Sequence, residues 1–154
     1  ISGLVDYYVN RTTKLFGGKV SFLLGTLRGI FNYRNTLADI TIDGKNIGRL
    51  NITLVAVANG RYFGGSMMVA PQAELDDGLF DIIIMKDISK LRFLKDGLKI
   101  YKGQHIIPPD VFMLRGKEIK VEEGGLYIDL DGEDAGTTPA TFRIVEKAID
   151  IIIP

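Results

Sequence analysis

The sequence predicts a mainly β fold of the α+β class: an antiparallel β-sandwich with an N-terminal helical segment and one inserted helix. Three observations predict it. Apolar residues recur at helical spacing only in the first part of the chain and in one later stretch. Elsewhere, short runs alternate with period two. Turn sequences separate these runs at roughly the 8 to 12 residue spacing of sandwiches and barrels. The 154 residues fit one domain.

Residues 1–34 form the expected helical lead-in, and residues 35–154 form the β domain. The Gly17-Gly18 pair divides the apolar pattern of the lead-in, and paired glycines favour a break in a helix. The simplest arrangement is therefore two helices separated by a glycine corner. The apolar positions at helical spacing are Leu4, Val5, Tyr8, Val20, Leu23, Leu24, Leu27, Ile30 and Phe31.

The first strands follow as a hairpin and two shorter runs. Ile40 and Ile42 alternate with polar neighbours, and "DGKN" (43–46) has the residues of a hairpin turn. The return strand continues to about Ala56. Beyond a loop, "SMMVA" (66–70) is expected to be a short strand, and "LFDIIIM" (79–85) is expected to be a buried one.

The inserted helix is predicted in "DISKLRFLKDGLKIYKG" (87–103), with Asp87 or Ser89 as its N-cap and Gly103 as its end. One stripe of this helix carries Leu91, Leu94, Leu98 and Tyr101. Five short strands are expected after it, in "VFMLRG", "KEIKVEEGG", "LYIDLDG", "TFRIVE" and "AIDIII".

Composition excludes several classes of function. Nineteen basic and nineteen acidic residues balance, so the chain lacks the positive charge expected of a nucleic-acid binder. It has no cysteine, which excludes thiolate metal sites and Cys nucleophiles. No apolar run approaches the ~20 residues that span a bilayer, and the first residues lack the pattern of a signal peptide. We expect a cytoplasmic domain without a transmembrane segment or a nucleic-acid partner.

A single histidine, His105, further narrows the chemistry. One histidine cannot build a multi-His metal site, and any His-assisted triad would depend on this residue alone. We expect a structural or surface role for His105, with orientation of a substrate as the alternative.

The loop "NGRYFGG" (59–65) is glycine-rich and joins two expected strands. Glycines let a backbone turn tightly or approach a ligand closely, so the loop is either a turn or part of a binding site. We assign Asn59, Gly64 and Gly65 in this loop, together with Asp131, as candidate substrate-binding residues.

The loop "AELDDGLFD" (73–81) is acidic and ends in Asp77-Gly78 before a buried strand. Such a loop can place a carboxylate and backbone carbonyls around a hard cation, because Mg²⁺ takes oxygen ligands. The alternative is a plain Asp-Gly turn that starts the strand.

The stretch "YIDLDGEDAG" (127–136) contains a cluster of carboxylates. Alternation predicts that Leu126, Ile128 and Leu130 face the core and that Tyr127, Asp129 and Asp131 lie on the other face. Gly132 turns the chain, which leaves Glu133 at the end of the strand. A carboxylate held there could accept a proton from an attacking hydroxyl, or the stretch could be only a solvated turn.

Taken in order, "ANGRYFGGSMMVAPQAELDDGLFDIIIM", "LYIDLDGEDAG" and the final "IIIP" resemble the C-terminal half of bacterial diacylglycerol kinase-like lipid kinases. Their superfamily also includes sphingosine, ceramide and NAD kinases. The resemblance covers nearly the whole chain from about Asn35, and a helical segment before the β domain suits it. It implies a two-domain kinase whose nucleotide-binding half, with a Gly-Gly-Asp-Gly-Thr motif, is absent from this sequence.

The resemblance also implies roles for individual residues. Glu133 corresponds to the catalytic base, which would take the proton from a lipid hydroxyl as that oxygen attacks the γ-phosphorus of ATP. A structural Mg²⁺ would be held by the side chain of Asp77 and the carbonyl oxygens of Glu74 and Leu79. ATP would be bound mainly by the missing half, because phosphoryl transfer needs positioning and charge neutralisation that two halves can share.

The expected function is therefore acceptor binding and base catalysis in an ATP-dependent kinase of diacylglycerol or a related lipid. The acceptor would be met at the membrane surface, a homodimer is compatible, and this half alone would be inactive. Two alternatives stay open. One changes the acceptor to phosphatidylglycerol, a sphingoid base or a soluble nucleotide. The other is a non-catalytic β-sandwich binding module whose acidic loops are mere turns.

Overall fold

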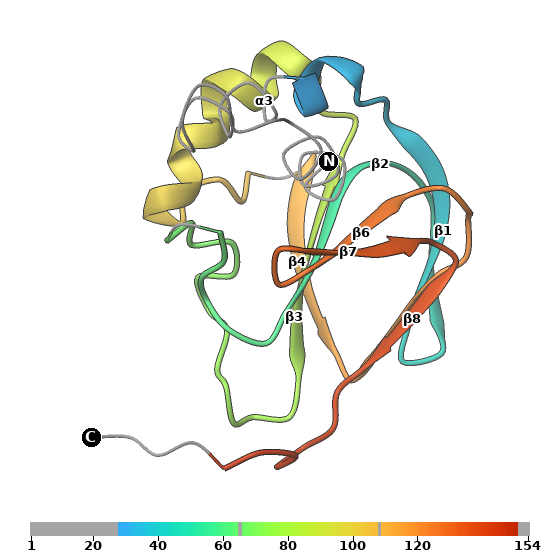
Figure 1. Ribbon diagram of the computed structural model, residues 1–154, viewed down its shortest axis with the longest axis vertical. Helices are drawn as coiled ribbons and strands as arrows, with labels where there is room; N and C mark the ends of the chain where they lie inside the picture. Colours follow the sequence, from blue (N-terminus) through green and yellow to red (C-terminus); the bar gives the residue numbers. More distant parts are fainter. Residues whose placement is uncertain (1–27, 65, 108, 151–154) are drawn as a thin grey trace.

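The computed structural model describes residues 28–64, 66–107 and 109–150, and its main element is an antiparallel sheet of six strands in the order β4-β3-β2-β1-β5-β8. β6 and β7 form a separate two-stranded sheet that lies across the main one (Figure 1). The strands are β1 (Thr36–Ile42), β2 (Lys45–Ala58), β3 (Phe80–Lys86), β4 (Val111–Gly116), β5 (Glu118–Val121), β6 (Tyr127–Leu130), β7 (Glu133–Thr137) and β8 (Ala140–Arg143). The predicted mainly β, antiparallel, sandwich-like fold with a helical insertion is confirmed.

The centre of the core is β3, which is buried on both faces. Ile82 and Ile84 belong to one apolar cluster with residues of β1 and β5, whereas Ile83 and Met85 belong to a second. A strand covered on both sides reads as a continuous apolar run, and this explains "LFDIIIM" without alternation. Leu126, just before β6, packs against the first cluster, so the β6–β7 hairpin closes over the sheet.

The expected hairpin at residues 43–46 is present. Asp43 and Gly44 turn the chain with φ of 47° and 76°, and β1 then pairs with β2. The Asp43 carboxylate also accepts hydrogen bonds from the backbone N–H groups of Lys117 and Glu118, at 2.9 and 2.8 Å. This turn therefore fixes the start of β5 beside β1.

The inserted helix is an α-helix followed by a tighter turn: α3 (Lys90–Asp96) and the 3₁₀ helix η2 (Gly97–Lys102). Ser89 caps α3 by accepting from the Arg92 N–H, and Gly103 ends η2 in the left-handed region, both as predicted. Phe93 and Ile100 pack against the second cluster of the core. The predicted leucine stripe lies on the opposite, solvent-exposed side.

Other expectations need correction. Residues 66–70 are not a strand; only an isolated bridge joins Phe63 to Met67, and Val69 is buried as part of a loop. Residues 133–137, for which no strand was predicted, form β7. Residues 148–150 of the predicted last strand are not a strand, and residues 151–154 lie outside the described part. In the predicted helical lead-in, residues 28–32 are helical. Residues 1–27 lie outside the part of the chain that the structure describes.

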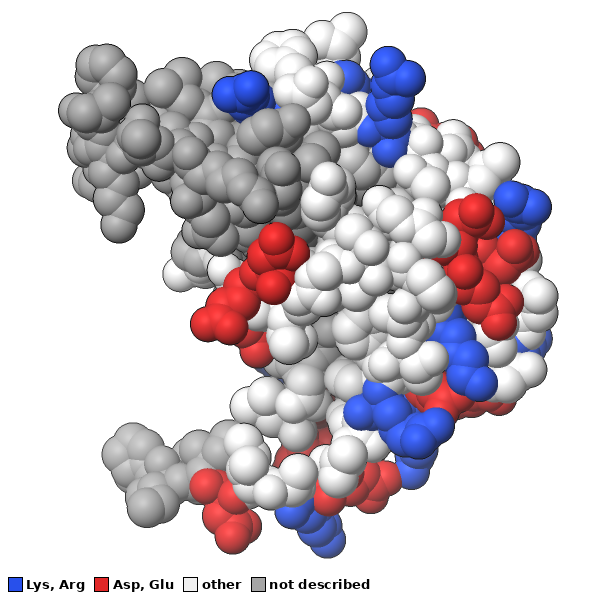
Figure 2. All heavy atoms as spheres, turned by 45° about the vertical axis from the view of Figure 1, so that its right-hand side comes forward, with Lys and Arg blue, Asp and Glu red and all other residues white. Residues whose placement is uncertain are grey.

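Charge is spread over the surface. On the face shown in Figure 2, basic and acidic side chains are interspersed around a wide uncharged area. No helix in the described ranges is long and apolar enough to cross a membrane.

Candidate functional site

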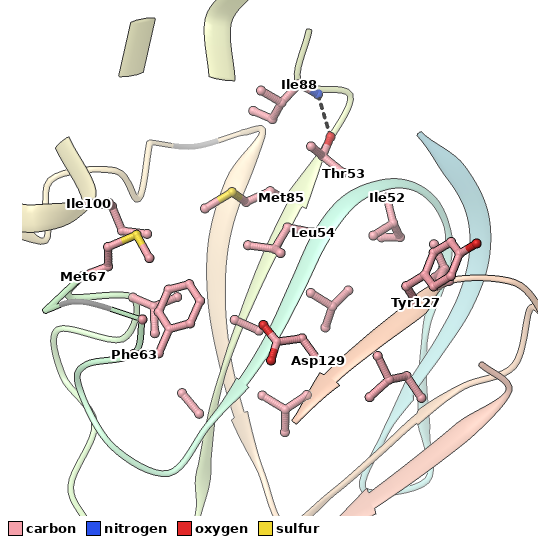
Figure 3. Close-up of a pocket in the computed structure, with 18 of the residues that line it drawn as sticks. Ile52, Thr53, Leu54, Phe63, Met67, Met85, Ile88, Ile100, Tyr127 and Asp129 are labelled. Atoms are coloured by element: carbon pink, nitrogen blue, oxygen red, sulfur yellow. Dashed lines mark hydrogen bonds between the residues drawn. The ribbon is translucent and has the colours of Figure 1, made fainter. Parts of the chain in front are cut away.

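A cavity of about 1160 Å³ lies between β2, the α3–η2 segment and the β6–β7 hairpin (Figure 3). Its lining is chiefly aliphatic and aromatic: Ile52, Leu54, Ala56, Ala58, Phe63, Met67, Met85, Ile100, Leu126 and Ile128. Small-molecule sites commonly measure ~300–1,000 Å³. This cavity therefore has the size and apolar lining to take a ligand with long hydrocarbon chains.

The polar side chains of the cavity come from several elements, and the β6–β7 hairpin contributes Tyr127, Asp129 and Asp131. Tyr127 and Asp129 both lie at the cavity in Figure 3. The Asp129 carboxylate accepts a hydrogen bond from the Gly132 N–H at 2.8 Å, across a turn in which Asp131 and Gly132 have φ of 52° and 92°. Gly132 makes the turn as predicted, and Asp131 lines the cavity.

Glu133 follows this turn as the first residue of β7, directly opposite Leu130. It is exposed and lies beyond the residues that line the cavity. The prediction that Leu130 faces the core is wrong, because this side chain is 57% exposed. Leu126 and Ile128, which were predicted to face the same way, are half-buried. A register shift between Tyr127 and Asp129 breaks the alternation on which that prediction rested.

The glycine-rich loop forms another part of the wall. Phe63 and Met67 exchange two backbone hydrogen bonds of 3.0 Å, which makes a tight turn around Gly64. Gly64 has φ of 41°, in the left-handed region that favours glycine, and a Cβ there would also lie 2.9 Å from Cε of Met67. Asn59 and Gly64 line the same cavity as Asp131, whereas Gly65 lies outside the described residues. Their substrate-binding role stays a prediction.

The Asp77 loop is held by its own carboxylate. Oδ1 of Asp77 accepts a hydrogen bond from the Leu79 N–H at 2.9 Å, and Oδ2 forms a short ion pair with the Arg115 guanidinium. Glu74, the third predicted metal-site residue, is exposed. Within the described ranges, no three His, Cys, Asp or Glu side chains converge to hold a metal ion. A cation here would thus depend on one carboxylate and on carbonyl oxygens.

Asp81 lies on β3 directly beside this loop and is fully buried. Within the described residues, neither of its oxygens has a hydrogen-bond partner, and its ion-pair partner is Nε of Arg115, 3.5 Å from Oδ1. Burial raises the pKa of Asp81, and the negative charge of Glu74 raises it further. The guanidinium of Arg115 therefore faces two carboxylates, those of Asp77 and Asp81. Negative charge exceeds positive charge in this group, which is compatible with a bound cation.

His105 is buried at the cavity wall, so the surface role considered for it is wrong. Its Nε2 donates a hydrogen bond to the Val69 carbonyl at 3.0 Å, while Nδ1 is buried without a partner among the residues that the structure describes. Burial lowers the pKa of His105, and the bond to Val69 partly opposes that shift. The neutral ring with its proton on Nε2 therefore fits this position.

Sequence reasoning assigned no role to two residues of the acidic loop's surroundings, Asp81 and Arg115. A signal for Asp81 was present, because an acidic residue inside the run "LFDIII" must be buried with the strand. Arg115 gave no local signal. It meets Asp81 only because β3 and β4 pair in register.

A six-stranded antiparallel sheet closed by a hairpin over an apolar cavity defines a β-sandwich-like domain with an internal ligand-sized site. Residues 1–153 match the model of the YegS C-terminal NAD kinase beta sandwich-like domain. Because the match covers nearly the whole chain, the chain belongs to this family.

Relatives and solved structures agree with the assignment. A diacylglycerol kinase of Bacillus subtilis strain 168 is 27% identical over 152 residues, covering 97% of this chain and 50% of the relative. One of Mycobacterium tuberculosis H37Rv is 28% identical over 137 residues, covering 89% and 44%. A crystal structure of an assigned diacylglycerol kinase from Bacillus anthracis strain Sterne superposes with a TM-score of 0.58 at 30% identity, covering 84% and 43%. The chain spans about half the length of these relatives.

Proposed function

We propose that this chain is the acceptor-binding half of an ATP-dependent lipid kinase that phosphorylates the hydroxyl of diacylglycerol or a related lipid. The observation that carries the proposal is the apolar cavity of about 1160 Å³ beside the turn that presents Glu133. Acyl chains would occupy the aliphatic part between β2 and η2. The names of the relatives, diacylglycerol kinase and lipid kinase, support the same substrate class.

Glu133 is the proposed general base. In phosphoryl transfer the acceptor hydroxyl must lose its proton as it attacks the γ-phosphorus, and a positioned carboxylate can accept that proton. The turn at Asp131 and Gly132 fixes the start of β7, and Glu133 projects from that start. In this proposal the acceptor's acyl chains lie in the cavity while its hydroxyl reaches out past Asp131 to Glu133.

The polar residues at the cavity would orient the head of the acceptor. Asn59, which is exposed, and Asp131 of the hairpin both line the cavity. Both can therefore hydrogen-bond to hydroxyl or ester groups. Gly64 would admit the ligand close to the backbone. Gly65 is proposed for the same role from the sequence alone.

The Asp77 loop is proposed to hold a structural Mg²⁺ through the Asp77 side chain and the carbonyl oxygens of Glu74 and Leu79. The fully buried carboxylate of Asp81, which accepts no hydrogen bond within the described residues, supports this, because a nearby cation would offset its charge. When bound, Mg²⁺ would supply positive charge and rigid oxygen coordination to the loop. ATP would be bound mainly by a nucleotide-binding half, since the matched family model describes a C-terminal domain.

A panel of acceptors tests the proposal. The full-length protein containing this chain is incubated with labelled ATP, Mg²⁺ and, in separate reactions, diacylglycerol, phosphatidylglycerol, a sphingoid base and NAD. We expect transfer to diacylglycerol or another of the two-chain lipids. Transfer of phosphate to NAD alone would show that the acceptor is a soluble nucleotide and not a lipid. Transfer to no acceptor would favour a non-catalytic binding module.

A further inference from the structure

A half-buried carboxylate stands at the apolar cavity. Asp129 lies on β6, and Figure 3 shows its carboxylate among the apolar side chains of the cavity wall. Its Oδ1 accepts the hydrogen bond from the Gly132 N–H at 2.8 Å. Among the residues that the structure describes, Oδ2 accepts no hydrogen bond and no Lys or Arg side chain pairs with this carboxylate. Oδ2 is therefore available to a donor on a ligand.

The other charged groups that the structure places at the cavity are either paired or exposed to water. Arg92 and Asp96 form an ion pair with each other. Arg34 and Asp131 are exposed, so water and salt screen their charges. A charge in apolar surroundings interacts several times more strongly with another charge than it does in water. Asp129 should therefore have the largest effect on which head-group charge the cavity accepts.

A carboxylate in this position discriminates between lipid head groups. A hydroxyl or an ammonium group can donate a hydrogen bond to Oδ2, and an ammonium group also gains from the opposite charge. A phosphodiester has no hydrogen to donate, and its negative charge repels that of Asp129. Specific sites commonly use such repulsion against the wrong ligand as well as attraction to the right one.

We propose that Asp129 is a specificity-determining residue of the acceptor site, which admits neutral or cationic lipid head groups and rejects anionic ones. The inference rests on the proposed lipid acceptor and narrows its class. Diacylglycerol and sphingoid bases would be accepted. Phosphatidylglycerol would be rejected, because its phosphodiester is attached to the same glycerol as the hydroxyl that would react.

The binding of three single-chain amphiphiles tests this selection without requiring catalysis. Decanol, decylamine and decyl sulfate have the same chain, but their head groups are neutral, positive and negative at neutral pH. Isothermal titration calorimetry of the full-length protein gives the Kd of each amphiphile below its micelle concentration. We expect the wild type to bind decyl sulfate at least about tenfold more weakly than decanol, and decylamine at least as tightly as decanol.

Asp129→Asn removes the charge and keeps an oxygen that can accept from the Gly132 N–H. We expect this variant to lower the preference for decylamine over decyl sulfate by about tenfold or more. Asp134→Asn is the matched control. Asp134 lies opposite Asp129 in the hairpin and accepts from the Gly136 N–H at 3.0 Å, but it lies outside the cavity lining. Its substitution should leave the preference at the wild-type value.

Ala56→Phe shows whether the amphiphiles occupy the cavity. It narrows the cavity and should weaken the binding of all three, and thermal melting checks that every variant is folded. The same preference in the wild type and Asp129→Asn would overturn the proposal. Binding that Ala56→Phe leaves unchanged would also overturn it, because the head groups would then lie elsewhere. So would tighter binding of decyl sulfate than of decylamine by the wild type, since Arg34 would then set the accepted charge.

Activity distinguishes failure of this inference from failure of the proposed function. Diacylglycerol and phosphatidylglycerol are offered to the full-length protein in the same nonionic detergent micelles. The ratio of kcat/KM for phosphatidylglycerol to that for diacylglycerol should rise about tenfold or more in Asp129→Asn and stay constant in Asp134→Asn. Phosphorylation of both lipids with an equal ratio in the wild type and Asp129→Asn would reject the role of Asp129 alone. Charge selection that depends on Asp129, without phosphorylation of any lipid, would reject the lipid kinase alone.

Discussion

His105 shows how a single buried group can set the pH dependence of the domain. Its ring lies against the cavity with Nε2 bonded to the Val69 carbonyl, and in the described part of the chain Nδ1 has no partner that would stabilise a second proton. Burial therefore lowers the pKa of His105 below its ordinary value of 6.5. A histidine with a lowered pKa in the folded state contributes most to stability when it is neutral, and stability falls when the ring must be protonated.

The first prediction concerns stability against pH. The contribution of His105 should be fully present above the unfolded-state pKa and should be lost as pH falls below about 6.5. His105→Gln keeps an N–H donor for Val69 but cannot titrate, so it should remove this part of the pH dependence. Urea denaturation between pH about 8 and pH about 5 measures it. An unchanged pH profile in the variant would show that His105 does not titrate on unfolding.

Arg115 is a second residue whose charge affects stability, through its contact with a buried carboxylate. It is the positive group that contacts both Asp77 and the fully buried Asp81. Arg115→Gln should therefore destabilise the domain, by about 1 to 3 kcal/mol in chelator, because the buried carboxylate loses its nearest counter-charge.

The control for this second prediction is Arg143→Gln. Within the described ranges Arg143 pairs with Glu118 alone, and its side chain is 70% exposed, so its removal should cost less than about 1 kcal/mol. Chemical denaturation of both variants at neutral pH gives the comparison. Equal losses would mean that the buried carboxylate gains nothing from Arg115.

At the scale of the loop, the question is whether residues 74–79 hold a cation. Asp77→Asn keeps an oxygen that can accept from the Leu79 N–H, and so keeps the turn, but it removes the charge. If Mg²⁺ binds, wild-type stability should rise by about 2.7 kcal/mol at a hundredfold excess over Kd, while Asp77→Asn should not respond. Thermal melting with Mg²⁺ and with EDTA checks this. A wild type that melts identically in both would identify the loop as a turn held by Arg115.

At the scale of the cavity, β2 offers a position for blocking it. Ala56 lines the cavity and has a small side chain on a rigid strand. Ala56→Phe should fill part of the acyl region and raise KM for long-chain acceptors about tenfold or more, while short-chain acceptors are turned over normally. Steady-state kinetics with two chain lengths provides its own control. Equal effects on both acceptors would place the acyl chains elsewhere.

The elements also show what the sequence could and could not predict. β3 was predictable because burial on both faces demands an apolar run. β7 was not, because "EDAGT" has no apolar alternation and is a strand only through its pairing with β6. The apolar stretch around Val69 looked like a strand, but it packs against the core as a loop. Short apolar runs do not distinguish these cases.

For the whole molecule, the site was predictable in its parts but not in its assembly. Asn59, Gly64 and Asp131 were each candidates, yet only the folded chain brings them to one cavity. The same holds for Asp77 and Arg115, which meet through the pairing of β3 with β4. The proposed base, Glu133, is the first residue of β7 and lies just outside the lining of this cavity.

The most direct measurement is transfer of labelled phosphate from ATP to diacylglycerol by the full-length protein, with Glu133→Gln compared with the wild type. Loss of a general base should lower kcat by about 10²- to 10⁴-fold with the fold and ATP binding retained. The neighbouring Asp134→Asn, also exposed on β7, should stay near the wild-type rate. Wild-type turnover by Glu133→Gln would contradict the assignment of the catalytic base.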